Sequence, residues 1–140
     1  MSVSKFNQVE NGLKAKVEAV YGVGKVFIGE YAAPQLFPRA EIFATEVRTE
    51  EKTIKGGKLT HFWTFAVELW ALGGDAREIY ADIKNKFWSI YDQLMADRTL
   101  GAGADVWATP SAGDLSSAPT GDGQYGFRWL MRVVVRVSEL

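Results

Sequence analysis

His61 is the only histidine of this 140-residue chain, and it is the first residue to test for chemistry. A catalytic imidazole needs a nucleophile or a metal partner within reach. The sequence contains neither a Gly-x-Ser-x-Gly nucleophile elbow nor a His-x-x-x-His metal pair. We therefore expect His61 to be a structural or surface residue, as lone histidines generally are.

Two further groups of residues have types that could bind a ligand. Asp75, Glu78 and Asp82 share one flank of a predicted helix, but acidic residues at a helix start are explained by the helix dipole alone. Gly22-Val-Gly24 lacks the third glycine and the preceding strand of a dinucleotide fingerprint. We predict no catalytic residue, no cofactor and no metal site, and expect a protein that is not an enzyme.

The composition is that of an ordinary globular chain that is rich in aromatic residues. The net charge is −1, with 47% hydrophobic, 24% charged and 13% aromatic residues, which argues against a strongly basic nucleic-acid surface. The absence of cysteine excludes disulfides and thiolate zinc sites. No apolar run approaches the roughly 18 residues of a membrane span, and the N-terminus lacks the layout of a signal peptide. We expect one domain, residues 1–140, with no membrane partner.

The clearest element is a helix that we place at about Asp75 to Asp97. An apolar stripe recurs at spacings of three and four: Ile79, Ile83, Phe87, Ile90 and Leu94. Asp75 can cap its free backbone N–H groups. A similar stripe predicts a first helix over residues 5–21, with Ser4 as its N-cap.

Alternating and β-rich segments predict the strands of a sheet. Strands are expected at about 25–28, 40–48, 61–70, 105–109 and 125–137. A hairpin tip at Gly56-Gly57 would place Phe43 opposite Trp70 and Val47 opposite Ala66, unless a bulge shifts the register. Residues 110–124 are expected to form a surface loop. The fold class is therefore α+β, a single mainly antiparallel sheet with two helices packed on one face.

Strand 61–70 is apolar on both faces, with Trp63 pointing one way and Trp70 the other. One face can be buried by helices, and the second needs another cover, for which a neighbouring subunit is the first candidate. Of the five tryptophans we expect most in the core and one or two at an interface. Aromatic residues tend to dominate binding energy at subunit contacts.

Arg128, Arg132 and Arg136 recur every four residues and form a ladder about 13 Å apart per step on one face of the final strand. The ladder can contact an acidic partner or DNA, or it can pair with carboxylates such as Glu46 or Glu68 on neighbouring strands. The predicted subunit or partner interface is Trp63, Trp70, Arg128, Arg132 and Arg136. The predicted docking loop contains Asp114, Leu115 and Asp122.

The order of elements resembles that of the tail terminator, or tail completion, proteins of long-tailed bacteriophages and their prophage relatives. Four segments that together span most of the chain carry the likeness: Pro38-Arg-Ala-Glu-Ile-Phe-Ala-Thr-Glu46, His61 to Trp70, Gly74-Asp-Ala-Arg-Glu-Ile-Tyr-Ala-Asp-Ile83 and Tyr125-Gly-Phe-Arg-Trp-Leu-Met-Arg-Val-Val.

The resemblance implies a virion structural protein of the tail and neck, assembled in the host cytoplasm. Such proteins form rings of about six copies on the end of the tail tube. The ring stops tube polymerisation and provides the surface for head-to-tail joining. The implied partners are further copies of the chain, the major tail-tube protein and a head-completion or connector protein, with DNA only as cargo through the lumen. A different neck component, or a small ligand-binding α+β domain, remains the alternative.

Overall fold

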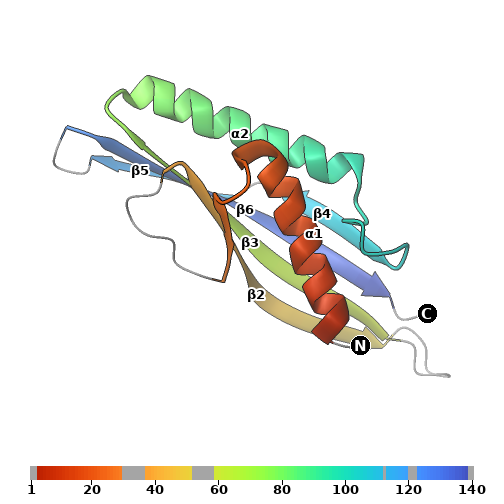
Figure 1. The fold of residues 1–140 in the computed structure, drawn as a ribbon. Coiled ribbons are helices and arrows are strands. Elements are labelled where there is room, and N and C mark those ends of the chain that lie inside the picture. The colour runs from red at the N-terminus through yellow and green to blue at the C-terminus, as the bar shows by residue number, and fades with distance from the viewer. Residues whose placement is uncertain (1–2, 30–36, 52–58, 112, 120–122, 139–140) are drawn as a thin grey trace.

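The protein is described by a computed structural model, which places residues 3–29, 37–51, 59–111, 113–119 and 123–138. Its elements are α1 (Val3–Tyr21), β1 (Val26–Ile28), β2 (Arg39–Glu51), β3 (Leu59–Gly73), α2 (Ala76–Ala96), β4 (Val106–Ser111), β5 (Leu115–Pro119) and β6 (Tyr125–Ser138). This is the expected α+β class, with two helices and one open sheet (Figure 1).

The sheet is mainly antiparallel and has β3 and β6 at its centre. The strand order is β1-β2-β3-β6-β4, and β5 also pairs with β6. Among the strand pairs of the described residues, β1 and β2 are parallel and the other four pairs are antiparallel. The β3–β6 ladder runs without a break from Thr60 opposite Ser138 to Gly73 opposite Tyr125.

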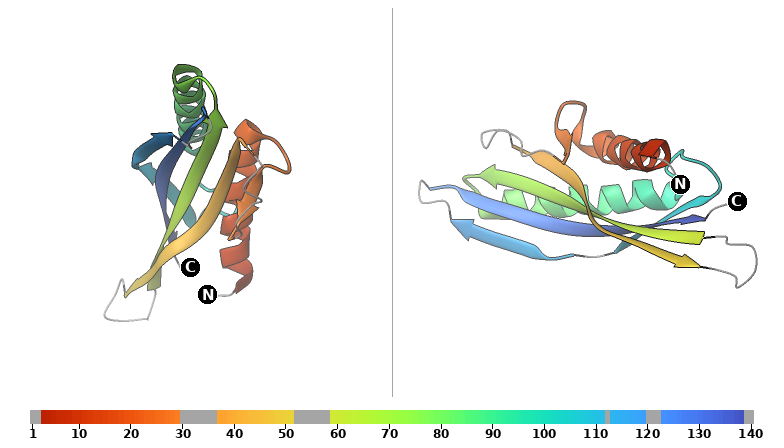
Figure 2. Two further views of the ribbon diagram at one scale, coloured as in Figure 1. Left: turned by 90° about the vertical axis from the view of Figure 1, so that its left-hand side faces the viewer. Right: turned by 90° about the horizontal axis from the view of Figure 1, so that it is seen from below.

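Both helices lie on one face of the sheet, as the two rotated views show (Figure 2). On this helix face, β3 contributes Trp63, Phe65, Val67, Leu69 and Ala71, all buried. The stripe of α2 meets them through Ile83, Phe87, Ile90 and Leu94, each at most 1% exposed. Alternation along the strands thus gives one apolar face, which the helices exclude from water.

The N-terminus of α2 forms as the sequence predicts. The Asp75 carboxylate accepts hydrogen bonds from the backbone N–H of Arg77 at 3.0 Å and of Glu78 at 3.3 Å. The expected cap of the first helix is wrong, because Ser4 lies inside α1, which already includes Val3. Helix boundaries depend on local hydrogen bonding that hydrophobic periodicity does not report.

The expected hairpin register is wrong by several residues. Phe43 lies opposite Ala66 instead of Trp70, and Val47 lies opposite Trp63 instead of Ala66. Two features explain the error. Glu51 lies opposite Leu59, a register that does not fit a two-residue turn centred on Gly56-Gly57. A further register shift occurs between Ala44 and Glu46. This β-bulge moves every later side chain of β2 to the other face.

The expected loop at residues 110–124 contains the end of one strand and the whole of another. Pro110 and Ser111 belong to β4, and Leu115–Pro119 is β5. Both strands pair with β6, and the register changes by one residue between Ser111 opposite Arg132 and Leu115 opposite Trp129. Gly113 lies at this irregularity so close to the Leu130 carbonyl that a Cβ atom would overlap it. The sequence pattern did not predict β5 because its serine, alanine and proline residues are weak strand formers.

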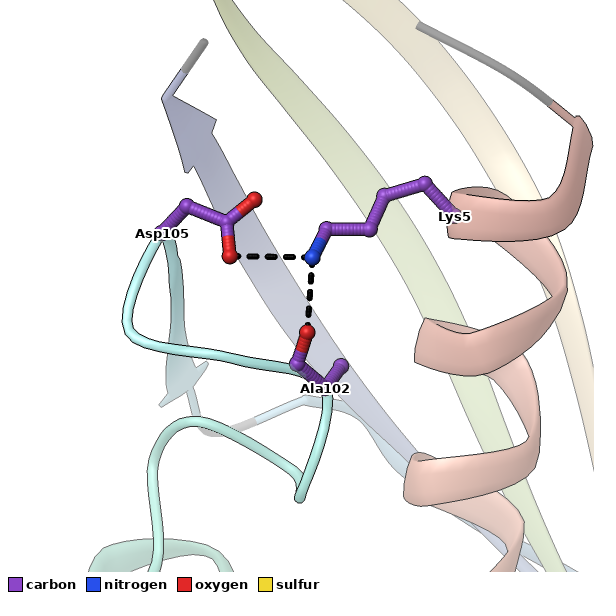
Figure 3. A network of polar contacts seen from close by, with 3 residues as sticks. All are labelled: Lys5, Ala102 and Asp105. Atoms are coloured by element: carbon purple, nitrogen blue, oxygen red, sulfur yellow. Dashed lines mark hydrogen bonds and ion pairs between the residues drawn. The ribbon is translucent and has the colours of Figure 1, made fainter. Parts of the chain in front are cut away.

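Polar contacts fix the start of α1 to the turn before β4. The Lys5 ammonium donates to the Ala102 carbonyl at 2.7 Å and to the Asp105 carboxylate at 2.9 Å (Figure 3). At the C-terminal end of α2, the Lys16 ammonium of α1 lies 3.5 Å from the Asp97 carboxylate. Segments distant in sequence are therefore joined where the helix layer meets the sheet.

Gly12 permits close packing of α1 against the same turn. A Cβ atom at this position would overlap the carbonyl oxygen of Leu100 and lie 2.9 Å from its Cβ. Leu100 is 4% exposed and has a φ of 56°, a conformation that non-glycine residues seldom adopt. The turn thus has little freedom to move away.

We expect Gly12→Ala to lower the free energy of unfolding by about 1–3 kcal/mol through overpacking. Alanine is favoured over glycine inside helices by about 0.5–1 kcal/mol, so a stabilising result would show that Leu100 can move. The control is Asn11→Ala, at an exposed position of the same helix, which should be neutral or slightly stabilising. Chemical denaturation measures both.

The carboxylate of Asp97 should make folding stability depend on acid pH. Hydrogen bonds from Thr99, whose hydroxyl donates at 2.6 Å, lower the pKa of Asp97, and Lys16 adds to the effect. A lowered folded-state pKa means stability that is present above the unfolded value of about 3.9 and is lost as pH falls through the folded value. The difference in melting temperature between wild type and Asp97→Asn should therefore shrink below about pH 4. A pH-independent difference would contradict this origin.

Candidate functional site

The far face, the side of the sheet away from the helices, is the surface where most of the predicted interface residues gather. Trp70 of β3 and Arg128, Arg132 and Arg136 of β6 all lie there, because they alternate with the buried positions of their strands. No described helix covers this face (Figure 2). Trp63 points to the opposite face, is 3% exposed and packs edge-on against Phe6 at 4.9 Å. It is therefore not accessible to a partner on the far face.

The predicted docking residues lie elsewhere. Asp114 is exposed between β4 and β5, and its carbonyl accepts a hydrogen bond from Leu130 at 2.9 Å. Leu115 opens β5 and is 39% exposed. Asp122 lies outside the described residues.

At one end of the far face, two arginine side chains contact the ring of a tryptophan. Arg39, Trp70 and Arg128 lie in register across β2, β3 and β6. Both guanidinium groups lie over the Trp70 ring, at 5.0 Å for Arg39 and 5.7 Å for Arg128. Cations over an indole ring are attracted by its π electrons.

Next to Arg39 and Trp70 on the same face lie two carboxylates that would repel each other if they were unpaired. Glu41 and Glu68 are directly opposite on β2 and β3, with side-chain exposures of only 4% and 12%. Arg128 donates to Glu68 at 2.6 Å, and the Arg39 Nε lies 3.4 Å from Glu41. The predicted pairing with Glu68 is therefore confirmed for Arg128 alone among the three arginines of the ladder, and Glu46 has no ion pair within the described residues. The charged side chains at this end of the far face are therefore paired within the subunit.

The other end of the far face has the opposite character. The side chains of Arg132 and Arg136 are exposed and form no hydrogen bond or ion pair with any described residue. Arg132 lies opposite Ala66 and Ser111, and Arg136 lies opposite Phe62 and Trp107. No directly opposite position supplies a carboxylate, and Glu68, which lies diagonally to both Arg128 and Arg132, pairs with Arg128. The charges of Arg132 and Arg136 therefore remain exposed to solvent.

Two further arginines border this end and were missed by the sequence interpretation. The Arg48 guanidinium lies 4.9 Å from the Phe62 ring centroid, and that of Arg98 lies 4.3 Å from the centroid of Trp107. The wrong hairpin register concealed the first contact. The second joins a residue after α2 to β4, and no sequence pattern reports it.

The described residues also bear on the metal and histidine chemistry considered from the sequence. No group of three or more histidine and carboxylate side chains among them could hold a metal ion. His61 is 8% exposed and shares a 2.9 Å hydrogen bond with the Thr49 hydroxyl. No described helix is long and apolar enough to cross a membrane.

Comparison with known proteins identifies a shared fold. No protein-family model and no curated protein matches the chain. A chain of the virion of a native gene transfer agent (GTA) particle is 13% identical over 91% of both chains, with a TM-score of 0.45. That likeness is too low to support an argument.

A second similar structure is that of an extracellular contractile injection system, described as the PVC sheath/tube terminator in the extended state. The similarity covers 100% of the present chain and 57% of that chain, with 10% identity and a TM-score of 0.52. The present chain thus shares its fold over its whole length with little more than half of that one.

Removing Arg128 and removing Arg136 should have different effects on stability. Arg128→Ala leaves Glu68 unpaired and nearly buried beside Glu41, which should cost about 1–3 kcal/mol of unfolding free energy. Arg136→Ala removes no hydrogen bond or ion pair with a described residue and should stay within about 0.5 kcal/mol of wild type. Equal losses in urea denaturation would contradict the division of the far face into two ends.

Proposed function

We propose that this chain is a structural component of a phage-tail-like particle that acts as a tail terminator. In this function, copies of the chain form a ring on the end of the tail tube, stop its polymerisation and present the surface for head-to-tail joining. The observation that carries the proposal is the fold shared over the full chain with a structure described as a sheath/tube terminator. It agrees with the resemblance seen in the sequence, which rests on other grounds.

The architecture supports an assembly role. A sheet covered by helices on one side only, with exposed arginine and tryptophan on the other, offers a surface that a partner can bury. Aromatic residues and arginine are the types enriched at protein interfaces. The helix layer carries additional exposed aromatics, Tyr80 at 40% and Trp88 at 49%. Two different interaction surfaces suit a component that must contact two different neighbours.

A different neck component remains the second candidate, since the fold alone does not distinguish it from a terminator. A ligand-binding α+β domain is favoured by no observation on the described residues. Partners under the proposal are further copies of the chain, the tail-tube protein and a head-completion protein. DNA passes through the lumen as cargo.

Tube polymerisation in vitro tests the proposal. The chain is added to polymerising tail-tube protein from the same genome, and tube lengths and ends are measured by negative-stain imaging. A terminator acts on tube ends, which are few. A molar amount of this chain far below that of the tube protein should therefore stop elongation and leave a ring at each capped end. A protein that only binds free tube subunits needs near-equal amounts, because it must sequester them one by one.

Solution assembly is measured in parallel by light scattering behind a sizing column across a concentration series. We expect closed rings of about six copies, in solution or on capped tubes. Tubes of unchanged length with rings in solution would favour another neck component. Unchanged tubes and a strict monomer would overturn both assembly roles.

A further inference from the structure

The exposed end of the far face holds four guanidinium groups that we call the arginine platform: Arg48, Arg98, Arg132 and Arg136. The four residues come from β2, the turn after α2, and β6. Its members divide into two held by aromatic rings and two without a described partner. We propose that this platform binds an acidic segment of another protein, in preference to nucleic acid and to a second copy of this chain.

The ring-held arginines are positioned before any partner arrives. Arg98 donates from Nε to the Ala108 carbonyl and from a terminal nitrogen to the Thr109 hydroxyl, both at 2.8 Å, and lies over Trp107. Arg48 lies over Phe62 and forms only a long, exposed contact with Glu50 at 3.5 Å. Guanidinium groups fixed in this way lose less side-chain entropy when a carboxylate binds their remaining donors.

Arg132 and Arg136 supply the charge that the subunit leaves unbalanced. They lie about 13 Å apart along β6, and the residues directly opposite them are Ala66, Phe62, Ser111 and Trp107. Arg128, four residues earlier on the same strand, is neutralised by Glu68 at 2.6 Å. Glu68 also lies diagonally to Arg132 but pairs with Arg128, so Arg132 and Arg136 have no ion pair with a described residue.

The same surface is poorly suited to nucleic acid. Base stacking needs free aromatic faces, and the Phe62 and Trp107 rings each already have a guanidinium group within 5 Å of their centroids. Glu46 and Glu50 are exposed on β2 at the border of the platform and would repel phosphates. A protein surface can place carboxylates on the arginines and a cation beside the glutamates, which a uniformly charged phosphate chain cannot do.

A second copy of this chain is also a poor occupant. The acidic flank at the start of α2 is partly engaged within the subunit, since Asp75 accepts hydrogen bonds from two backbone N–H groups and Asp82 pairs with Lys86 at 2.6 Å. Exposed carboxylates of the helix layer such as Glu78 and Asp92 are separated along α2. The inference rests on the proposed assembly function only for the expectation that the far face meets another protein.

Peptide binding to the full chain tests the inference. The probes are a fluorescent peptide with glutamates four residues apart, its glutamine counterpart, and short single-stranded and duplex DNA. An extended peptide of this pattern repeats its carboxylates at about 13 Å, the spacing of Arg132 and Arg136. We expect the glutamate peptide to bind more tightly than the other probes, with an affinity that falls as salt is raised.

The decisive variant is the double reversal Arg132→Glu with Arg136→Glu. It should weaken peptide binding about tenfold or more, because two charge-assisted contacts become repulsive, while the melting temperature stays unchanged. Arg77→Glu, an exposed reversal on α2, is the matched control and should bind as wild type. A platform with a purely structural role would lose melting temperature in the double variant and show no preference for the glutamate peptide.

Three results would overturn the inference: equal binding of the glutamate and glutamine peptides, tighter binding of DNA that is lost in the same variant, or loss of self-association in that variant. The first leaves no acidic partner, the second assigns the platform to nucleic acid, and the third assigns it to a second copy. Tube capping is scored separately. A double variant that loses peptide binding and still stops elongation would show that termination does not use the platform.

Discussion

The structure depends on one constraint, which is that both helices cover the same face of a long antiparallel sheet. The β3 and β6 strands are joined from end to end, and their helix-facing residues Phe65, Val67, Met131 and Val133 are completely buried. Apolar area removed from water on this side supplies most of the driving force for folding. The far face must then be stabilised by contacts within the sheet or by contacts with another molecule.

The elements that the sequence predicts well are those whose signal is local and repeated. The α2 stripe and the Asp75 cap lie within one helix, and the alternation from Tyr125 onwards marks β6 by itself. The errors fall where the outcome depends on pairing between strands. A bulge beside Thr45 changes which face Val47 occupies, and β5 is a strand because β6 offers it a free edge, although its own residues favour a loop.

The candidate site could be predicted only in part for the same reason. Periodicity alone places Arg128, Arg132 and Arg136 on one face, and the structure agrees. Periodicity does not show that Glu68 lies within reach of Arg128, or that the residues opposite Arg136 are aromatic. Both facts depend on the register between neighbouring strands. Trp63 and Trp70 likewise differ in exposure only because the helices cover one of the two faces.

Neutralisation is what separates the two ends of the far face. Around Trp70, each carboxylate has an arginine and each arginine has a ring or a carboxylate, so this end can be nearly buried without an uncompensated charge. Around Phe62, the rings already hold arginines, and Arg132 and Arg136 have no described anion. An unpaired charge is tolerated while water solvates it, but a partner that buries it must bring a carboxylate. The arginines without partners therefore select what can bind at this end, whereas those with partners contribute to the stability of the fold.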